Sequence, residues 1–313
     1  MRRQRVLDAT LALLLNLGTA HYAVAAETDP AVLRWLPHDY PRDRARVDPR
    51  ALPWRAIGRV NRHGSHQHCT GALVGERWVL TAAHFVWPLR QFPDEVHFLA
   101  GFAGDRYQAH SRVVRFRWAA LTDEAPRGAD DWALLELREP LGRAVGVLPW
   151  ALLDTEGYTR LRADERAFTL VGYRGDRPFV QTAARGCRLG EYAADGRLMT
   201  HDCPTAPGDS GGPLLLERAG TYLLIGIGIG GLTAGQATAG ARWPRIVQGV
   251  FIPSACFAAT LTALGPAPRP LFTDDARGAT ATAVAARTLS TAPTRPARPA
   301  PVARRPSPDS RHR

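Results

Sequence analysis

Short apolar runs separated by glycine, proline and aspartate follow one another along most of the chain after residue 53. Each run has the length of a β-strand rather than that of a helix, and turn residues stand between successive runs. The runs that we interpret as strands cover residues 55–60, 70–74, 77–80, 113–118, 132–137, 167–171, 213–216, 223–229 and 246–252. This spacing predicts an all-β domain, either a barrel or a sandwich.

A single segment has a convincing helical pattern, and it comes late in the chain, at residues 254–264. Ser254 is placed to cap its start, and Gly265 is placed to end it. From Gly265 onward the sequence is rich in Pro, Ala, Thr and Arg and shows no periodicity. Such a composition buries too little apolar surface to order itself, so we expect residues 265–313 to form a disordered tail.

The first 26 residues are typical of a secretory signal peptide. Arginines at positions 2, 3 and 5 precede an apolar stretch, and small residues stand before Glu27. Residues 27–52 then form an N-terminal segment and candidate propeptide, and residues 53–264 form the folded domain. No apolar run approaches the roughly 20 residues of a membrane-spanning helix. We therefore expect a secreted or periplasmic protein without a transmembrane segment.

The formal net charge of +11 would suggest a nucleic-acid partner if it were spread over the folded domain. Most of it lies instead in the tail, which has nine Arg against three Asp, and in the leader. We therefore expect no nucleic-acid partner and regard the tail as a candidate contact for anionic envelope polymers. All 40 basic residues are Arg, which excludes chemistry that requires a lysine.

Export makes disulfides chemically accessible to the four cysteines. Cys187 and Cys203 flank a segment in which the turn 194–196 separates two strand-like runs, so the two thiols can face each other across a hairpin. This is the favoured pair. The other two cysteines, Cys69 and Cys256, either pair with each other or remain thiols.

Three motifs carry the residue types of acyl-transfer chemistry. Thr81-Ala82-Ala83-His84 follows a predicted strand directly, and Asp131 stands at the start of another. The third motif, Gly208-Asp209-Ser210-Gly211-Gly212-Pro213, presents a serine between glycines that allow a close approach of the backbone to a substrate carbonyl.

Acyl transfer needs a nucleophile, a base, a carboxylate that orients the base, and donors for the oxyanion. The motifs supply all of them. Ser210 is the candidate nucleophile and His84 the candidate base, and Asp131 would orient His84. The backbone N–H groups of Gly208 and Ser210 are the candidate oxyanion hole.

On these motifs, the chain resembles the trypsin-like serine endopeptidases of the chymotrypsin fold over residues 53–264. Residues 43–47 and 53–57 are similar to the N-terminal region of the secreted bacterial glutamyl endopeptidases. The resemblance implies two antiparallel six-stranded β-barrels with a C-terminal helix, with His84 and Asp131 in the first barrel and Ser210 in the second. It also implies a protein or peptide substrate held by strand addition between the barrels. We expect a monomer that needs neither cofactor nor metal.

The sequence departs from that family in three respects. Phe85 stands where the family usually has the cysteine that pairs with the Cys69 position. No Ile-Val-Gly-Gly sequence occurs, so insertion of a new N-terminus beside Asp209 is not expected. The positions that line the specificity pocket by this resemblance carry no charge, and they are Pro204, Thr205, Gly228, Gly231 and Gly249.

The sequence leaves two alternatives open, one for a metal site and one for the function. His63, His66 and His68 would suit a zinc or copper site, but no second pair of ligands follows them, so we favour a polar hairpin loop and no metal. A protease-fold binding or adhesion module that does not cleave is the alternative function. The complete set of Ser, His, Asp and oxyanion donors favours the enzyme.

Overall fold

The computed structural model describes residues 44–119, 124–194, 196–233 and 246–272. The chain divides into two units, residues 1–271 and 272–313, and the fold given below is that of the first. The predicted signal peptide, residues 27–43 and most of the predicted tail lie outside the described residues. In the described part of the chain, no helix has the length and apolar character needed to span a membrane.

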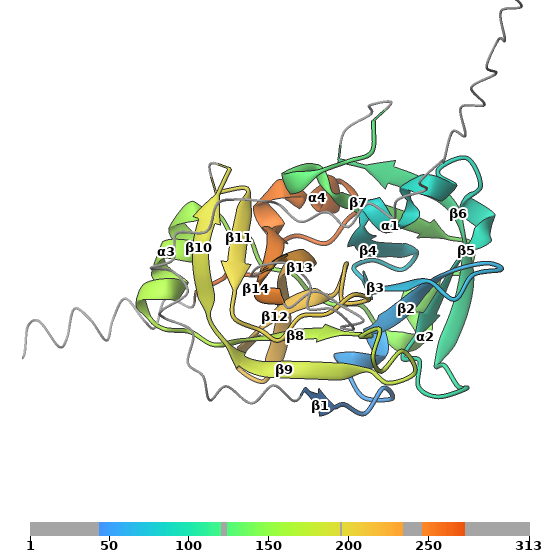
Figure 1. The fold of residues 1–313 in the computed structure, drawn as a ribbon, viewed down its shortest axis with the longest axis horizontal. Coiled ribbons are helices and arrows are strands. Elements are labelled where there is room, and N and C mark those ends of the chain that lie inside the picture. The colour runs from blue at the N-terminus through green and yellow to red at the C-terminus, as the bar shows by residue number, and fades with distance from the viewer. Residues whose placement is uncertain (1–43, 120–123, 195, 234–245, 273–313) are drawn as a thin grey trace, which may run out of the picture. The chain divides into compact units, whose positions relative to one another are not determined.

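Six antiparallel strands close into a barrel, seen on the right of Figure 1. They are β2 (Ile57–Arg62), β3 (His68–Leu73), β4 (Trp78–Ala82), β5 (Val96–Ala100), β6 (Ala109–Trp118) and β7 (Trp132–Leu137), paired in the order β2-β3-β4-β7-β6-β5. Strand β5 was missing from the predicted runs. Its residues alternate, with Val96, Phe98 and Ala100 fully buried, so the period-two pattern was present in a segment without a long apolar run.

The second sheet contains eight antiparallel strands. They are β1 (Ala45–Arg46), β8 (Phe168–Gly172), β9 (Thr182–Cys187), β10 (Leu189–Ala193), β11 (Leu198–His201), β12 (Pro213–Arg218), β13 (Thr221–Thr233) and β14 (Ile246–Pro253), in the order β1-β9-β8-β12-β13-β14-β11-β10. Together with the closed barrel, this sheet confirms the predicted all-β chymotrypsin-type fold. The resemblance implied six strands here, and two more are present because β1 joins one edge and β10 the other.

A disulfide joins the end of β9 to the segment after β11. Cys187 and Cys203 form it, and beside it the amide of Asp202 donates to the carbonyl of Arg188. Strands β9 and β11 lie near opposite edges of the hydrogen-bonded order. The second sheet is therefore curled, and the disulfide joins two strands that do not pair through backbone hydrogen bonds.

The helices are short; three lie in connections between strands and the fourth follows the last strand. They are α1 (Ala83–Val86), α2 (Leu141–Val145), α3 (Thr155–Ala163) and α4 (Ala258–Ala263). The prediction of a single late helix was wrong for α3, which begins where the Asp154 carboxylate accepts the amide of Gly157 at 2.8 Å. Its apolar face is narrow, with Tyr158 and Leu161 as its large buried side chains, so the periodicity was weak.

The late helix begins further along the chain than predicted. A 3₁₀ turn covers Ser254–Cys256, and α4 starts at Ala258. Ser254 does not cap a helix. Its buried hydroxyl donates to the carbonyl of Ala151 at 2.6 Å and accepts the amide of Leu153 at 2.7 Å. The serine therefore joins the C-terminal segment to the connection that precedes α3.

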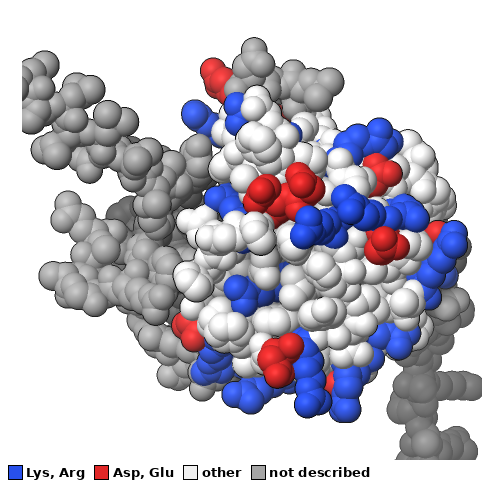
Figure 2. Space-filling view, turned by 90° about the vertical axis from the view of Figure 1, so that its right-hand side faces the viewer, with Lys and Arg blue, Asp and Glu red and all other residues white. Residues whose placement is uncertain are grey.

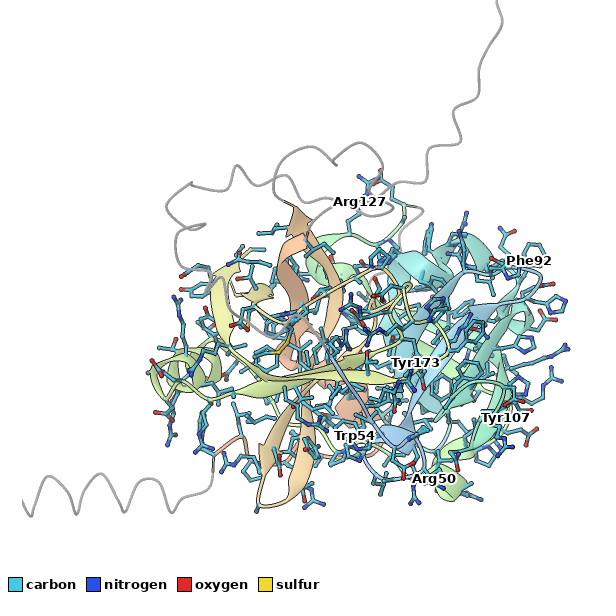
Figure 3. All side chains as sticks on the ribbon, turned by 60° about the horizontal axis from the view of Figure 1, so that its bottom comes forward. Arg50, Trp54, Phe92, Tyr107, Arg127 and Tyr173 are labelled. Atoms are coloured by element: carbon cyan, nitrogen blue, oxygen red, sulfur yellow. A yellow bond between two sulfur atoms is a disulfide. The ribbon has the colours of Figure 1, made fainter. Side chains whose placement is uncertain are left out.

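Buried polar side chains connect the barrel to the second sheet. The hydroxyl of Tyr173, which Figure 3 labels near the middle of the molecule, donates to the carbonyl of Phe102 at 3.0 Å. The amide of Gln181 donates to the carbonyls of Trp54 and Ile57, each at 3.0 Å. Because these donors and acceptors are buried, each of these bonds fixes the two sheets in one relative position.

Charged side chains of both signs are interspersed on the face that Figure 2 shows. Ion pairs of the barrel follow the same pattern, for example Arg115 with Glu136 at 2.5 Å and Arg143 with Glu76 at 2.8 Å. Such exposed pairs contribute little to stability. Their effect is to break up the positive charge of the arginines on this part of the surface.

Replacing the disulfide by Cys187→Ser and Cys203→Ser should lower the free energy of unfolding by about 3 kcal/mol, the loop-closure value for a short loop. The bond spans 16 residues. Denaturant unfolding of both proteins under identical conditions measures the difference. Cys256→Ser is the matched control because Cys256 is a free, partly buried thiol. A loss equal to that of the control would contradict the prediction.

Candidate active site

The pairing of two barrel strands brings His84 beside Asp131. Strand β4 pairs with β7 so that Ala82 lies opposite Trp132. His84 follows β4 in the first turn of α1, and Asp131 immediately precedes β7. The amide of Ala83 donates to the carbonyl of Asp131 at 3.2 Å, which continues the pairing by one step. The two predicted residues, 47 positions apart in sequence, are therefore neighbours.

Asp131 holds His84 through both of its carboxylate oxygens. Oδ1 accepts the backbone amide of His84 at 2.7 Å, and Oδ2 lies 2.7 Å from Nδ1 of the ring. Because a carboxylate only accepts, Nδ1 is the donor to Asp131, and in the neutral ring the proton is therefore on Nδ1 and not on Nε2. Asp131 is buried, whereas the His84 side chain keeps 26% of its surface exposed. The arrangement fixes both the orientation and the tautomer of an accessible imidazole.

The segment around Ser210 is a tight loop that requires glycine. Gly208 and Gly211 have φ angles of +95° and +78°, a region that side chains with a Cβ rarely adopt. A Cβ on Gly211 would also lie 2.1 Å from the carbonyl oxygen of Thr70. The amide of Gly211 donates to Gly228 in β13 at 2.7 Å. These contacts explain the glycine pattern of the motif and fix the loop against both sheets.

Two backbone donors of this loop are unused. Within the described ranges, neither the amide of Gly208 nor that of Ser210 donates to another protein group, while the amides of Asp209, Gly211 and Gly212 all do. Unpaired N–H groups on both sides of one residue are what an oxyanion hole requires. Their role as oxyanion donors stays a prediction.

Thr70 in β3 joins the loop to the barrel. Its amide donates to the carbonyl of Ser210 at 2.9 Å, and its hydroxyl donates to the carbonyl of Gly208 at 2.8 Å. The same Thr70 accepts a hydrogen bond from the hydroxyl of Thr81, three residues before His84. The structure thus brings the Ser210 segment against β3, which pairs with β4, the strand that leads to His84. Among the described residues, no hydrogen bond joins the Ser210 hydroxyl to His84.

The two unpaired cysteines stay reduced. Cys69 is fully buried, and its thiol contacts the carbonyl of Ser210 and the hydroxyl of Thr81. Burial raises the pKa of this thiol to about 12. Cys256 is elsewhere, with its thiol 3.6 Å from the carbonyl of Arg197. Phe85 replaces the missing cysteine partner with a buried ring, over which the guanidinium of Arg62 stacks at 4.5 Å.

The predicted pocket residues lie on the β13–β14 pair and on the segment before Ser210. The register places Gly231 opposite Gly249, with Gly228 opposite Phe251. The hydroxyl of Thr205 donates to the carbonyl of Cys203 at 3.0 Å. A Cβ on Gly228 would make ordinary contacts, 3.7 Å from the nearest side-chain atom.

His201 lies beside the predicted pocket residue Gly249, and the sequence analysis did not identify it. Its ring fills the space beside Gly249, where a Cβ would lie 2.0 Å from Cε1. Nδ1 accepts the amide of Cys203 at 3.1 Å, and Nε2 is buried without a partner among the residues described. Its alternation with buried Met199 in β11 was the available signal that it points inward.

The histidines at positions 63, 66 and 68 do not converge. His68 bonds to the carbonyl of Tyr173 at 2.9 Å, while His63 stacks on His97 and lines a cavity of about 290 Å³ with His110 and Tyr107. No group of three or more His, Cys, Asp and Glu residues able to hold a metal is found in the part of the chain that the structure describes.

Comparisons with known proteins give likenesses at the level of the family and of the fold. The family model of the trypsin-like peptidase domain matches residues 69–227, about half of the chain. Human complement C1r subcomponent-like protein is 33% identical over 116 residues, which are 34% of this chain and 22% of that protein. A solved structure of Glu endopeptidase in complex with MPD has a TM-score of 0.55 and 18% identity, covering 73% of this chain and 96% of that one. This last likeness shows the fold.

The folded protein should lose stability as the pH falls from about 6.5 to about 3 because of His201. Burial, with the charge of Arg44 adding to it, lowers the pKa of this imidazole to about 3. Between that value and the ordinary one of about 6.5, the unfolded chain binds a proton that the folded chain excludes, so unfolding is favoured. Above about pH 6.5, His201 is neutral in both the folded and the unfolded chain, so this loss of stability is absent.

Replacing His201→Asn should reduce the pH dependence of the unfolding free energy in this window by one proton. Asn keeps an acceptor for the Cys203 amide but does not titrate. The exposed His66→Asn variant is the control. Equal slopes in all three proteins would contradict the assignment.

Proposed function

The chain belongs to the trypsin-like peptidase domain family, and we propose that it is an exported serine endopeptidase that hydrolyses peptide bonds through Ser210, His84 and Asp131. The observation that carries the proposal is the pair of hydrogen bonds that the backbone amide and Nδ1 of His84 donate to the carboxylate of Asp131. It holds the ring in the tautomer that a general base needs. The geometry of the Ser210 loop supports the same chemistry.

In the acylation step, Nε2 of His84 takes the proton of the Ser210 hydroxyl as its oxygen attacks the substrate carbonyl. The tetrahedral intermediate places its negative oxygen at the free amides of Gly208 and Ser210. His84, then protonated, is stabilised by Asp131 and donates its proton to the leaving amine. The products of this step are an acyl-enzyme and the released amine.

Deacylation repeats these roles with water as the nucleophile. His84 takes a proton from the water, the oxygen attacks the ester carbonyl, and the same two amides hold the oxyanion. The Ser210 oxygen leaves with the proton from His84. Each step uses groups that this chain supplies, and the partial exposure of His84 lets water reach the base.

Export is supported by the Cys187–Cys203 disulfide, because disulfides persist in oxidising compartments. The signal-peptide pattern of residues 1–26 points the same way.

We further propose that Pro204, Thr205, Gly228, Gly231 and Gly249 line an uncharged specificity pocket. Thr205 contributes the pocket hydroxyl, which already donates to Cys203 and so offers an acceptor to a substrate. His201 behind Gly249 stays neutral near pH 7 because its pKa is about 3. A Glu or Arg side chain would therefore find no opposite charge among these residues, and burying an unpaired charge is costly.

Ser210→Ala should abolish peptide hydrolysis while leaving the fold intact, with a loss on the order of 10⁶ in kcat. The change removes the nucleophilic oxygen and very little packing. Labelling of the mature protein with a fluorophosphonate probe, followed by peptide mapping, should identify Ser210 as the modified residue. Ser65→Ala, at an exposed serine, is the control and should label normally. A folded wild-type protein that does not label would instead favour the non-cleaving binding module.

Peptides that differ only in the residue before the cut bond test the pocket. We expect Leu and Gln to give kcat/KM at least about tenfold above Glu and Arg, because a charge buried without a partner costs several kcal/mol. Gln and Glu form a matched pair that differs chiefly in charge. Mass spectrometry of the products locates the cut, and a preference for Glu or Arg would refute the uncharged pocket.

A further inference from the structure

Arg44 reaches from the first described residue into the centre of the second sheet. It precedes β1, whose two residues pair with Ala183 and Thr182 of β9. From there its guanidinium donates through Nη2 to the carbonyls of Thr182, at 2.8 Å, and Leu170, at 3.3 Å. Strands β8 and β9 are thus bridged by one buried side chain, which is 1% exposed.

The remaining terminal nitrogen of Arg44 meets the residue next to the nucleophile. Nη1 lies 2.5 Å from Oδ1 of Asp209, whose side chain is 2% exposed. The space for this pair is provided by Gly172 in β8, since a Cβ there would lie 2.5 Å from the same carboxylate oxygen. The segment before β1, strand β8 and the Ser210 loop therefore all contact this one buried ion pair.

Asp209 is held at both oxygens and sits between the two proposed oxyanion donors. While Oδ1 contacts Arg44, Oδ2 accepts the amide of Ala206 at 3.0 Å. Fixing this side chain restricts the two peptide planes that flank it. The following plane carries the amide of Ser210, and the preceding plane carries the carbonyl of Gly208, whose own amide lies one plane further back. A carboxylate buried without its partner would be strongly unfavourable and would turn toward water, displacing the Ser210 amide and Gly208 with it.

The electrostatic surroundings of Arg44 agree with this assignment. Burial lowers the pKa of its guanidinium, and the attraction of Asp209 opposes that effect. In the loop after β8, the charge of Arg174 lowers the pKa of Arg44 and that of Asp176 raises it. The charge of Arg44 in turn lowers the pKa of His201 in β11. Asp209 is therefore the counterion that keeps a deeply buried cation in place.

We propose, on the basis of the peptidase function above, that Arg44 is a positioning residue that orders the oxyanion hole through Asp209. The cation comes from within the chain, so a new N-terminus is not required, which fits the absence of an Ile-Val-Gly-Gly sequence. Residues 44–46 are then part of the working enzyme. Any processing of the N-terminal segment has to stop before Arg44, because a cut at residue 52 would release the activating side chain.

The test compares the secreted full-chain protein with three variants: Arg44→Met, Arg44→Lys and the double variant Arg44→Met/Asp209→Asn. Arg46→Met is the matched control, an exposed arginine two residues away in β1. For Arg44→Met we expect kcat to fall by about 10²–10³, the effect of losing an oxyanion donor, with KM changed by less than about threefold. The control should keep wild-type kcat.

The double variant separates positioning from stability. It contains no unpaired buried charge, so it should recover the stability that Arg44→Met loses while kcat stays low. Arg44→Lys adds a second readout, because a lysine near its ordinary pKa of about 10 loses its charge where arginine does not. Its kcat/KM should fall reversibly above about pH 10, while the wild-type protein shows no such loss up to the same pH.

Each outcome bears on the inference. Wild-type kcat in the folded double variant, or in folded Arg44→Met, overturns it, as does an Arg44→Lys profile that matches the wild type at alkaline pH. If the wild-type protein itself neither cleaves peptides nor labels with the fluorophosphonate probe, the proposed function has failed and the inference falls with it. Active wild-type protein with equally active variants refutes only the role of Arg44.

Discussion

The hydrogen bonds of Thr70 are the constraint on which the arrangement of the site depends. The two halves of the proposed triad belong to different sheets, so their relative position has to be fixed by contacts between sheets. Thr70 is fully buried and bonds Ser210, Gly208, Tyr173 and Thr81 at once. The side chain and backbone of Thr70 thereby connect the Ser210 loop, the second sheet and the strand leading to His84.

The close approach that Thr70 enforces determines which residues its surroundings tolerate. A Cβ at Gly211 would collide with the Thr70 carbonyl, and one at Gly172 would collide with Asp209 and make a tight contact of 3.0 Å with the Thr70 hydroxyl. Cys69, the preceding residue, directs its thiol at the Ser210 carbonyl from a fully buried position. The family's cysteine partner is replaced here by Phe85. The Cys69 thiol instead has the Ser210 carbonyl as its acceptor, and the Phe85 ring packs under the guanidinium of Arg62.

Sequence patterns predicted the elements that local physics specifies. The strand that ends before His84 and the strand that begins after Asp131 were apolar runs of strand length, and the glycines around Ser210 indicated a loop of close backbone approach. What the sequence could not supply were partners distant along the chain. Arg44 and Asp209 are 165 residues apart and share no local motif. His201 is buried because β14 pairs with β11, and this pairing cannot be derived from the residues around His201. Helix α3 was missed because its apolar face is narrow.

Two carboxylates lie at the proposed active site, and their surroundings differ. Asp131 pairs with an imidazole that is partly exposed, so in the proposed mechanism the charge of that pair changes each time His84 takes or returns a proton. Asp209 pairs with a guanidinium enclosed from solvent, and arginine keeps its proton throughout the physiological range. In the proposed mechanism, proton transfer is therefore confined to the barrel side of the site, and the second sheet supplies a buried guanidinium–carboxylate pair. Because the proposed oxyanion donors lie next to this second pair, their geometry is set by a contact that does not include the proposed base.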